Sequence, residues 1–197
     1  APDIAYHFDK VERGYDALID VFGADHGGYV KRMKAAVSAL SDGETPLDIK
    51  LIQLVKLLEN GAPLKMSKRA GTFVTLADVV EMVGRDAIRF VMLTRKNDAP
   101  LDFDVTLLKQ TNNDNPVYYV QYAHARVASI LKRAEAAGID VSDATLAAQA
   151  DLSHAADLAV AKKLSEWPRT IEIAARSNEP HRIAFYLQEL AQRFNTR

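Results

Sequence analysis

The strongest constraint on the fold is a change of pattern near residues 97–113. Before it, residues 15–22 and 47–58 are apolar runs that favour strands, and residues 25–41 carry apolar side chains at helical spacing. After it, the chain reads as one helix after another. We therefore predict an α/β part followed by an all-α part, with too few strands to complete a doubly wound sheet.

The limits of the individual elements follow from capping and turn residues. Residues 3–13 favour a short helix with Asp3 at its N-cap, and Asp25 is a candidate cap for the helix that follows the first strand. Residues 47–58 fit either strand or helix by their period, and we favour a strand. Further helices are predicted at 76–83 and 86–94, and the all-α part is expected to break near 138–143, 167–168 and 178–180.

Composition excludes several kinds of site. The 197 residues contain no cysteine, which rules out disulfides and thiolate zinc sites, and the histidines show no metal-ligand spacing. The formal net charge is −1, so any RNA must be held by local patches. No apolar run approaches the roughly 20 residues that cross a bilayer, and the N-terminus lacks a signal-peptide pattern. We expect no protein-bound metal and no membrane association.

A basic segment within residues 60–73 carries the strongest chemical signal. Lys65, Ser67 and Lys68 lie between two glycines that leave the backbone permissive. Lysines there can neutralise charge on a leaving pyrophosphate, and small residues let backbone N–H groups approach phosphate oxygens. The alternative is a solvated basic turn. The segment is not a P-loop, because no Walker-type glycine and lysine spacing is present.

Two motifs carry a family resemblance. Residues 65–69, Lys-Met-Ser-Lys-Arg, resemble the Lys-Met-Ser-Lys-Ser signature of class I aminoacyl-tRNA synthetases. Residues 115–126, Asn-Pro-Val-Tyr-Tyr-Val-Gln-Tyr-Ala-His-Ala-Arg, closely resemble the start of the anticodon-binding domain of bacterial arginyl-tRNA synthetases. The resemblance runs from about residue 3 to residue 135 and is weaker beyond.

The resemblance implies three regions. Residues 1–60 correspond to the distal part of a Rossmann-like catalytic domain, residues 61–104 to the signature loop and a helical connecting region, and residues 105–197 to a truncated helical-bundle anticodon-binding domain. Nothing in the chain resembles the His-x-Gly-His signature of the first catalytic half, and there is no initiator methionine. We therefore expect a fragment that is inactive alone.

The resemblance also assigns the small-molecule site. Asp3 is expected to pair with the guanidinium of arginine, since a carboxylate can accept two parallel N–H bonds from that planar group. The remaining assignments are Gly23, Asp25, His26, Met66 and Lys68 for ATP, with Lys65, Ser67 and Lys68 as catalytic residues. Structural alternatives are a helix cap for Asp3 or Asp25 and a strand-ending turn for Gly23.

The long predicted helix after residue 115 offers a stripe for RNA. Tyr119, Tyr122, Arg126 and Arg133 lie along it, and aromatic rings beside arginines suit single-stranded anticodon bases. The alternative is that the tyrosines pack in the core and the arginines are solvated. Both interpretations remain open from the sequence.

The implied activity is ligation of L-arginine to its tRNA, with ATP as substrate, Mg²⁺ accompanying ATP, and an arginyl-adenylate intermediate. We expect a cytoplasmic monomer. One alternative is a stand-alone RNA-binding module in residues 105–197, and another is a helical interaction domain. A related class I enzyme, the cysteinyl synthetase, needs a zinc site with a cysteine ligand, which this chain lacks.

Overall fold

The chain folds into two compact units. The computed structural model describes residues 2–64, 74–149 and 151–196. The first unit combines residues 1–56 with 96–102, and the second combines 57–95 with 103–197. The predicted domain borders, after residues 60 and 104, stay predictions.

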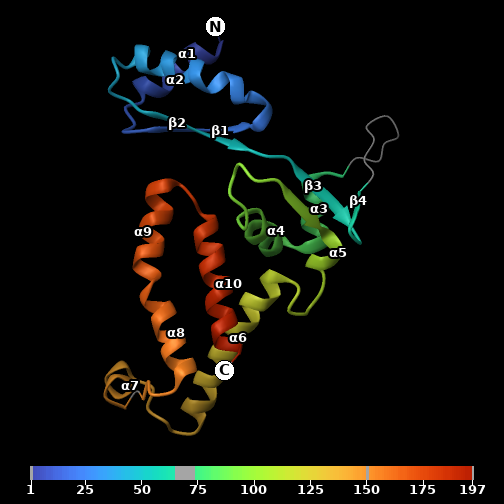
Figure 1. Cartoon of the computed structure of the whole chain (residues 1–197), viewed down its shortest axis with the longest axis vertical. Helices are drawn as coiled ribbons and strands as arrows, with labels where there is room; N and C mark the ends of the chain where they lie inside the picture. Colours follow the sequence, from blue (N-terminus) through green and yellow to red (C-terminus); the bar gives the residue numbers. More distant parts are fainter. Residues whose placement is uncertain (1, 65–73, 150, 197) are drawn as a thin grey trace. The chain divides into compact units, whose positions relative to one another are not determined.

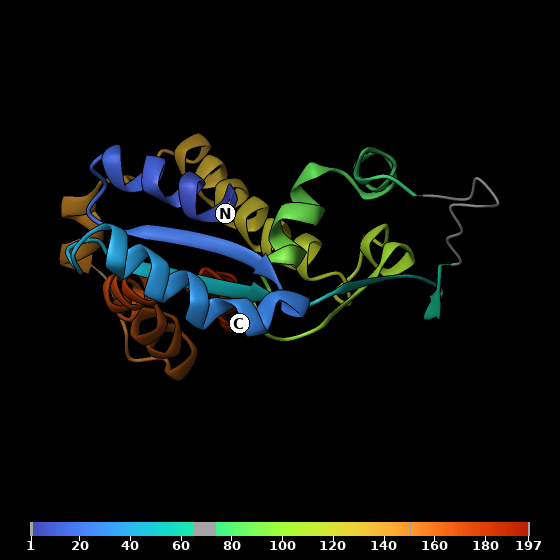
Figure 2. The same ribbon diagram turned by 90° about the horizontal axis from the view of Figure 1, so that it is seen from above.

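The first unit is a small α/β layer. Its elements are α1 (Pro2–Glu12), β1 (Leu18–Gly23), the 3-10 helix η1 (Ala24–Tyr29), α2 (Val30–Leu40) and β2 (Leu47–Ile52). β1 and β2 pair in parallel, with Leu18 opposite Leu47 and Gly23 opposite Ile52. Figures 1 and 2 show α1 and α2 beside each other on one face of these strands.

The core of this unit lies between α2 and the sheet. Met33 and Val37 on α2 are 2% and 0% exposed, and they pack against Leu18, Leu47 and Ile49. A spacing of four on a helix and of two on a strand places each set on one face. Full burial of one such side chain contributes about 1.5–3 kcal/mol, so this small cluster fixes the sheet that carries the site.

The second unit begins with a short hairpin. β3 (Val55–Glu59) pairs antiparallel with β4 (Ala62–Pro63), and β5 (Leu101–Asp104) lies on the other side of β3. The connecting residues Asn60 and Gly61 have φ angles of 52° and 75°. An Asn-Gly pair is favoured in two-residue hairpin turns, because both positions require positive φ.

Three short helices accompany the hairpin: α3 (Leu76–Val83), α4 (Arg85–Met92) and α5 (Val105–Leu108). Thr75 and Asp78 form a capping box at the start of α3, in which each side chain accepts from the backbone N–H of the other residue. Gly84, with φ 84°, separates α3 from α4. Phe103 and Val105 beside this group are 0% and 2% exposed.

The rest of the second unit is helical. Its elements are α6 (Pro116–Ala136), α7 (Asp143–Gln149), α8 (Ala155–Ser165), α9 (Trp167–Ser177) and α10 (His181–Asn195). α10 contacts α6, α8 and α9, an arrangement visible in Figure 1. Asn115 caps α6 by accepting from the N–H groups of Val117 and Tyr118. Its side-chain amide donates to the carbonyl of Leu108, which ties α5 to the start of α6.

The fold class is confirmed, with local corrections. Asp3 is not an N-cap, because α1 already begins at Pro2. Asp25 caps no helix either, since it lies inside η1 and α2 begins only at Val30. The strand predicted over 47–58 is divided into β2 and β3, and β5 was not predicted.

Candidate active site and RNA-binding surface

A cavity of about 370 Å³ opens in the first unit beside α1, the carboxyl end of β1 and η1. Three residues predicted from the sequence line it together: Asp3, Gly23 and His26. Ligands of α/β folds bind at the carboxyl ends of parallel strands, which is where this cavity lies. Its polar lining also includes Tyr6, His7, Lys10, Asp20 and Tyr29.

A buried network holds α1 against β1 at the cavity. Nε2 of His7 lies 2.6 Å from Oδ2 of Asp20, and Lys10 Nζ donates to Oδ1 at 2.7 Å. Burial alone would raise the pKa of Asp20, but the hydrogen bonds from Lys10 and His7 outweigh it and hold that pKa below its ordinary value. The carboxylate is therefore ionised, and its charge is offset within the network.

Asp3 provides a second, more exposed carboxylate. Its Oδ2 accepts from the Tyr29 hydroxyl at 3.1 Å, and this hydrogen bond raises the pKa of Tyr29. The backbone oxygen of Asp3 lies 2.7 Å from Nδ1 of His7. Within the described part of the chain, no cation forms an ion pair with Asp3. Its negative charge thus remains available to a guanidinium group, with Tyr29 to orient it.

The three residues predicted for adenosine are placed differently. Gly23 has an extended backbone, and a Cβ there would meet only the Oδ1 of Asp25, at 2.6 Å, which belongs to an exposed side chain that can turn away. The His26 ring lies at the cavity beside Phe22, with the ring centroids 5.9 Å apart. Asp25 does not line the cavity, and its side chain is 83% exposed.

The predicted signature-loop residues Lys65, Met66, Ser67 and Lys68 lie outside the described residues. Their assignment to ATP and to catalysis therefore stays a prediction.

The predicted RNA stripe on α6 is divided between two hollows. Tyr122, Arg126 and Arg133 line a hollow of about 260 Å³, together with Ser129 and Ile130. Arg126 also donates from Nη1 to Oδ1 of Asn195 at 3.0 Å, so one edge of its guanidinium is used within the protein. Tyr119 is absent from this group.

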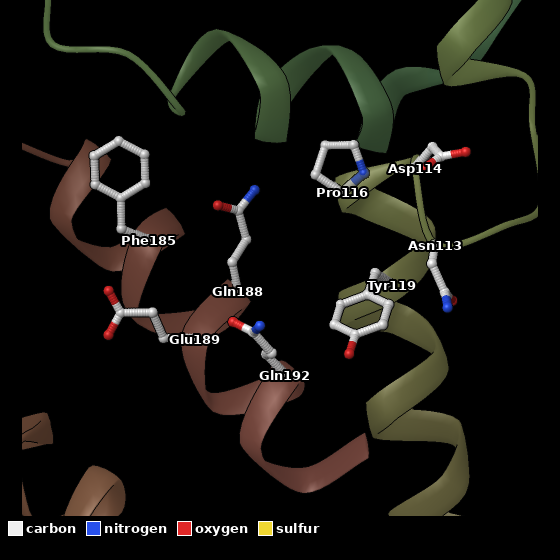
Figure 3. Close-up of a pocket in the computed structure, with 8 residues that line it drawn as sticks. All are labelled: Asn113, Asp114, Pro116, Tyr119, Phe185, Gln188, Glu189 and Gln192. Atoms are coloured by element: carbon white, nitrogen blue, oxygen red, sulfur yellow. The ribbon is translucent and has the colours of Figure 1, made fainter. Parts of the chain in front are cut away.

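Tyr119 lines a separate pocket of about 460 Å³ between the start of α6 and α10. Figure 3 shows its ring facing α10, where Gln188 and Gln192 project, with Phe185 one turn before. The other lining residues are Asn113, Asp114, Pro116 and Glu189. Amides can donate and accept, and the ring offers a stacking face, which are the two requirements for binding an unstacked base.

A buried lysine fixes one wall of this pocket. Lys163 on α8 is 7% exposed, and its Nζ donates to Glu189 at 2.5 Å and to Glu166 at 2.8 Å. Burial lowers the pKa of Lys163, but these two carboxylates outweigh it and raise that pKa. The ammonium also lies 5.0 Å from the ring centroid of Tyr186. The lysine therefore joins α8 to α10.

Several residues of the cavity were not assigned from the sequence. His7 lies four residues after Asp3, and Lys10 lies three residues after His7, which places all three on one face of α1. Asp20 lies two residues after Leu18 and so shares the buried face of a largely apolar strand, where an acid is itself a signal of a polar partner. No local pattern points to Tyr29.

Comparisons with known proteins agree with the motifs. A family model described as the DALR anticodon binding domain matches residues 120–197. Over 99% of its length the chain is 73% identical to an arginine–tRNA ligase of Ruegeria pomeroyi. It is 67% identical to that of Paracoccus denitrificans over 100% of its length. Along its length this sequence is similar to part of an arginyl-tRNA synthetase. It spans 34% of the length of each of these two synthetases.

Solved structures of arginyl-tRNA synthetases are also similar to this chain. A Campylobacter jejuni crystal structure, described as a candidate arginyl-tRNA synthetase, matches 98% of this chain with a TM-score of 0.83 and 36% identity, over 42% of its own length. The Thermus thermophilus arginyl-tRNA synthetase matches 92% of this chain and 32% of its own with a TM-score of 0.64. At 23% identity, the Thermus match supports the synthetase fold alone.

The described residues show neither a membrane-spanning helix nor a metal-binding cluster. None of the helices in those ranges is long and apolar enough to cross a membrane. The same ranges hold no group of three or more His, Cys, Asp or Glu side chains arranged to hold a metal ion.

Proposed function

We propose that this chain is part of an enzyme that ligates L-arginine to its tRNA with ATP. The arginine carboxylate attacks the α-phosphate of ATP, so that arginyl-adenylate forms and pyrophosphate leaves. A ribose hydroxyl at the tRNA 3′ end then attacks the adenylate carbonyl and AMP leaves. The observation that carries this proposal is the cavity in which Asp3, Gly23 and His26 meet.

In this proposal the cavity holds the amino acid and the adenosine. Asp3 accepts two N–H bonds from the arginine guanidinium, and the Tyr29 hydroxyl orients the carboxylate. Gly23 and His26 lie beside adenosine, and Asp25 contacts the ribose from outside the described cavity. The network of His7, Lys10 and Asp20 keeps Asp3 in place, because His7 contacts its backbone oxygen.

The signature loop supplies the charge for pyrophosphate departure. Lys65, Ser67 and Lys68 stabilise the leaving group, and Met66 and Lys68 contact ATP. Mg²⁺ accompanies ATP and is held mainly by phosphate oxygens. Catalysis rests on positioning and electrostatic stabilisation, without a covalent enzyme nucleophile.

The helical part binds the anticodon of the arginine tRNA. One unstacked base enters the pocket beside Tyr119, Gln188 and Gln192. The backbone and a second base contact the hollow of Tyr122, Arg126 and Arg133. We further propose that the enzyme is a monomer and acts in the cytoplasm.

A second candidate is a stand-alone RNA-binding module, favoured by the anticodon-domain match over residues 120–197. The two are separated with a chimaera, the Ruegeria pomeroyi ligase in which the matching third is replaced by this chain. Arginylation by the chimaera within tenfold of the unmodified ligase supports the enzyme. Tight filter binding of tRNA by the isolated chain, with an inactive chimaera, supports the module instead.

A further inference from the structure

The Asn60–Gly61 turn is held from outside its own hairpin. The backbone N–H of Gly61 donates to Oδ2 of Asp104 at 2.7 Å. The N–H of Asn60 donates to Oγ1 of Thr106 at 3.1 Å. Both acceptors are more than 40 positions away in the sequence, so these bonds are tertiary contacts at a surface turn.

The acceptors are themselves fixed. Oδ1 of Asp104 caps α5 by accepting from the N–H groups of Thr106 at 2.8 Å and Leu107 at 3.4 Å. At the other end of α5, the carbonyl of Leu108 accepts from the buried side chain of Asn115. One carboxylate thus serves a helix with one oxygen and the hairpin turn with the other. The turn is tied to a helix that cannot shift freely.

The hairpin has little support of its own. β4 is only two residues long, and the ladder continues through one further bond, from the N–H of Leu64 to the carbonyl of Leu57 at 2.9 Å. β5 lies beside β3, but β4 is an edge strand that pairs only with β3. Because a two-stranded pairing is marginally stable in water, contacts of the turn outside the ladder help to decide how firmly β4 is held. In the sequence, Lys65 follows Leu64 directly.

We propose that Asp104 and Thr106 are positioning residues for the signature loop, because they fix the hairpin from which residues 65–69 continue. The proposal rests on the proposed function, in which that loop acts on ATP. Neither residue touches substrate. Each acts by holding a backbone N–H group of the Asn60–Gly61 turn.

The two bonds from the turn to Asp104 and Thr106 form a clamp. Hydrogen exchange on the 197-residue chain tests this clamp and requires no enzymatic activity. Thr106→Val removes the acceptor and keeps the branched shape, whereas Thr106→Ser keeps the acceptor. We expect the Asn60 amide to exchange at least tenfold faster in T106V and within twofold of the unaltered rate in T106S. The amide of Val37, in the core of the other unit, reports whether folding is intact. Equal Asn60 rates in T106V and the unaltered chain would overturn the clamp.

Kinetics of the chimaera test whether these bonds position the signature loop for catalysis. In ATP–pyrophosphate exchange with tRNA present, T106V and Asp104→Asn should lower kcat about tenfold, because Asn can accept on only one side of the carboxylate position. The KM for arginine should stay within twofold. T106S should keep the activity, as should Asp102→Asn, which alters an exposed acid on the same strand.

The outcomes remain distinguishable. An unaltered kcat in T106V, with faster Asn60 exchange, overturns the positioning role. A raised KM for arginine with unchanged kcat overturns it as well, since the defect would then lie in the amino-acid cavity. A parent chimaera without any pyrophosphate exchange overturns the proposed function and the loop role together, and the Asn60 amide still decides the clamp.

Discussion

Nε2 of His7 on α1 lies 2.6 Å from Oδ2 of Asp20 on β1, and both side chains are buried. An acid in the middle of a short apolar strand would be costly alone. Here its other oxygen accepts from Lys10. Because Nδ1 of His7 also contacts the backbone oxygen of Asp3, the pair links the strand to the carboxylate proposed to bind arginine.

Replacement of Asp20 by Asn should lower the stability of the first unit in a pH-dependent way. The pKa of Asp20 in the folded chain lies below its ordinary value of 3.8, so its ionised form stabilises the fold fully above about pH 5. That contribution is lost as the pH falls through the folded pKa. At pH 7 we expect Asp20→Asn to cost about 1–3 kcal/mol in urea unfolding followed by circular dichroism.

The same unfolding measurement at acid pH provides the internal control. Between pH 5 and pH 2 the unaltered chain should lose stability more steeply than the variant, because the variant has no such carboxylate to protonate. Parallel pH profiles for the two proteins would show that Asp20 is not the group that titrates.

Tyr29→Phe should raise the KM for arginine about fivefold in the chimaera and leave kcat unchanged. The lost hydroxyl donates to Asp3 at an exposed position, where one hydrogen bond is worth about 1 kcal/mol. Tyr15→Phe is the matched control, since its hydroxyl accepts from Arg13 and lies outside the cavity. Steady-state arginylation kinetics measure both, and an equal KM in the two variants would count against the role of Tyr29.

Lys68→Ala should slow adenylate formation by at least a hundredfold, because the ammonium is proposed to neutralise the leaving pyrophosphate. Affinity for tRNA should change less than twofold. Single-turnover kinetics measure the step, and Lys31→Ala, an exposed lysine on α2, serves as the control. A variant as fast as the control would remove the signature loop from the mechanism.

Arg133→Ala should weaken tRNA binding and reduce the salt dependence of the binding constant by about one phosphate contact. Arg133 lines the hollow beside Tyr122, whereas its neighbour Lys132 does not. Filter binding over a series of salt concentrations gives the slope for both alanine variants. If Lys132→Ala changes the slope as much as Arg133→Ala, the hollow has no special role.

Elements set by local signals could be predicted from the sequence. α6 begins at Pro116, with Asn115 as its N-cap, as this pair of residues predicts. Capping and the first helical turn depend only on neighbours in the chain. The break between β2 and β3 could not be predicted. There the N–H of Gln53 donates to the carbonyl of Asn97, a partner that only the folded chain brings near. β5 likewise exists through its pairing with β3.

The residues of the candidate site also divide into those that the sequence predicts and those that it does not. Resemblance identified Asp3, Gly23 and His26, and all three line one cavity. The pairing of His7 with Asp20 depends on how α1 lies on β1, which no local pattern encodes. Tyr119 and Tyr122 are three positions apart, yet they line different hollows: Tyr119 lies with Gln188 and Gln192 of α10, and Tyr122 lies with Arg126 and Arg133 of α6.

Discrimination of the chimaera between arginine and citrulline, measured as the ratio of kcat/KM in tRNA charging, tests whether Asp3 binds the guanidinium group of the substrate. Citrulline replaces the guanidinium with a neutral group of similar shape. We predict that the chimaera prefers arginine by at least about a thousandfold, and that Asp3→Asn reduces this ratio at least about tenfold. A chimaera that does not charge tRNA would contradict the proposed function, and a preference unchanged by Asp3→Asn would contradict the binding of arginine by Asp3.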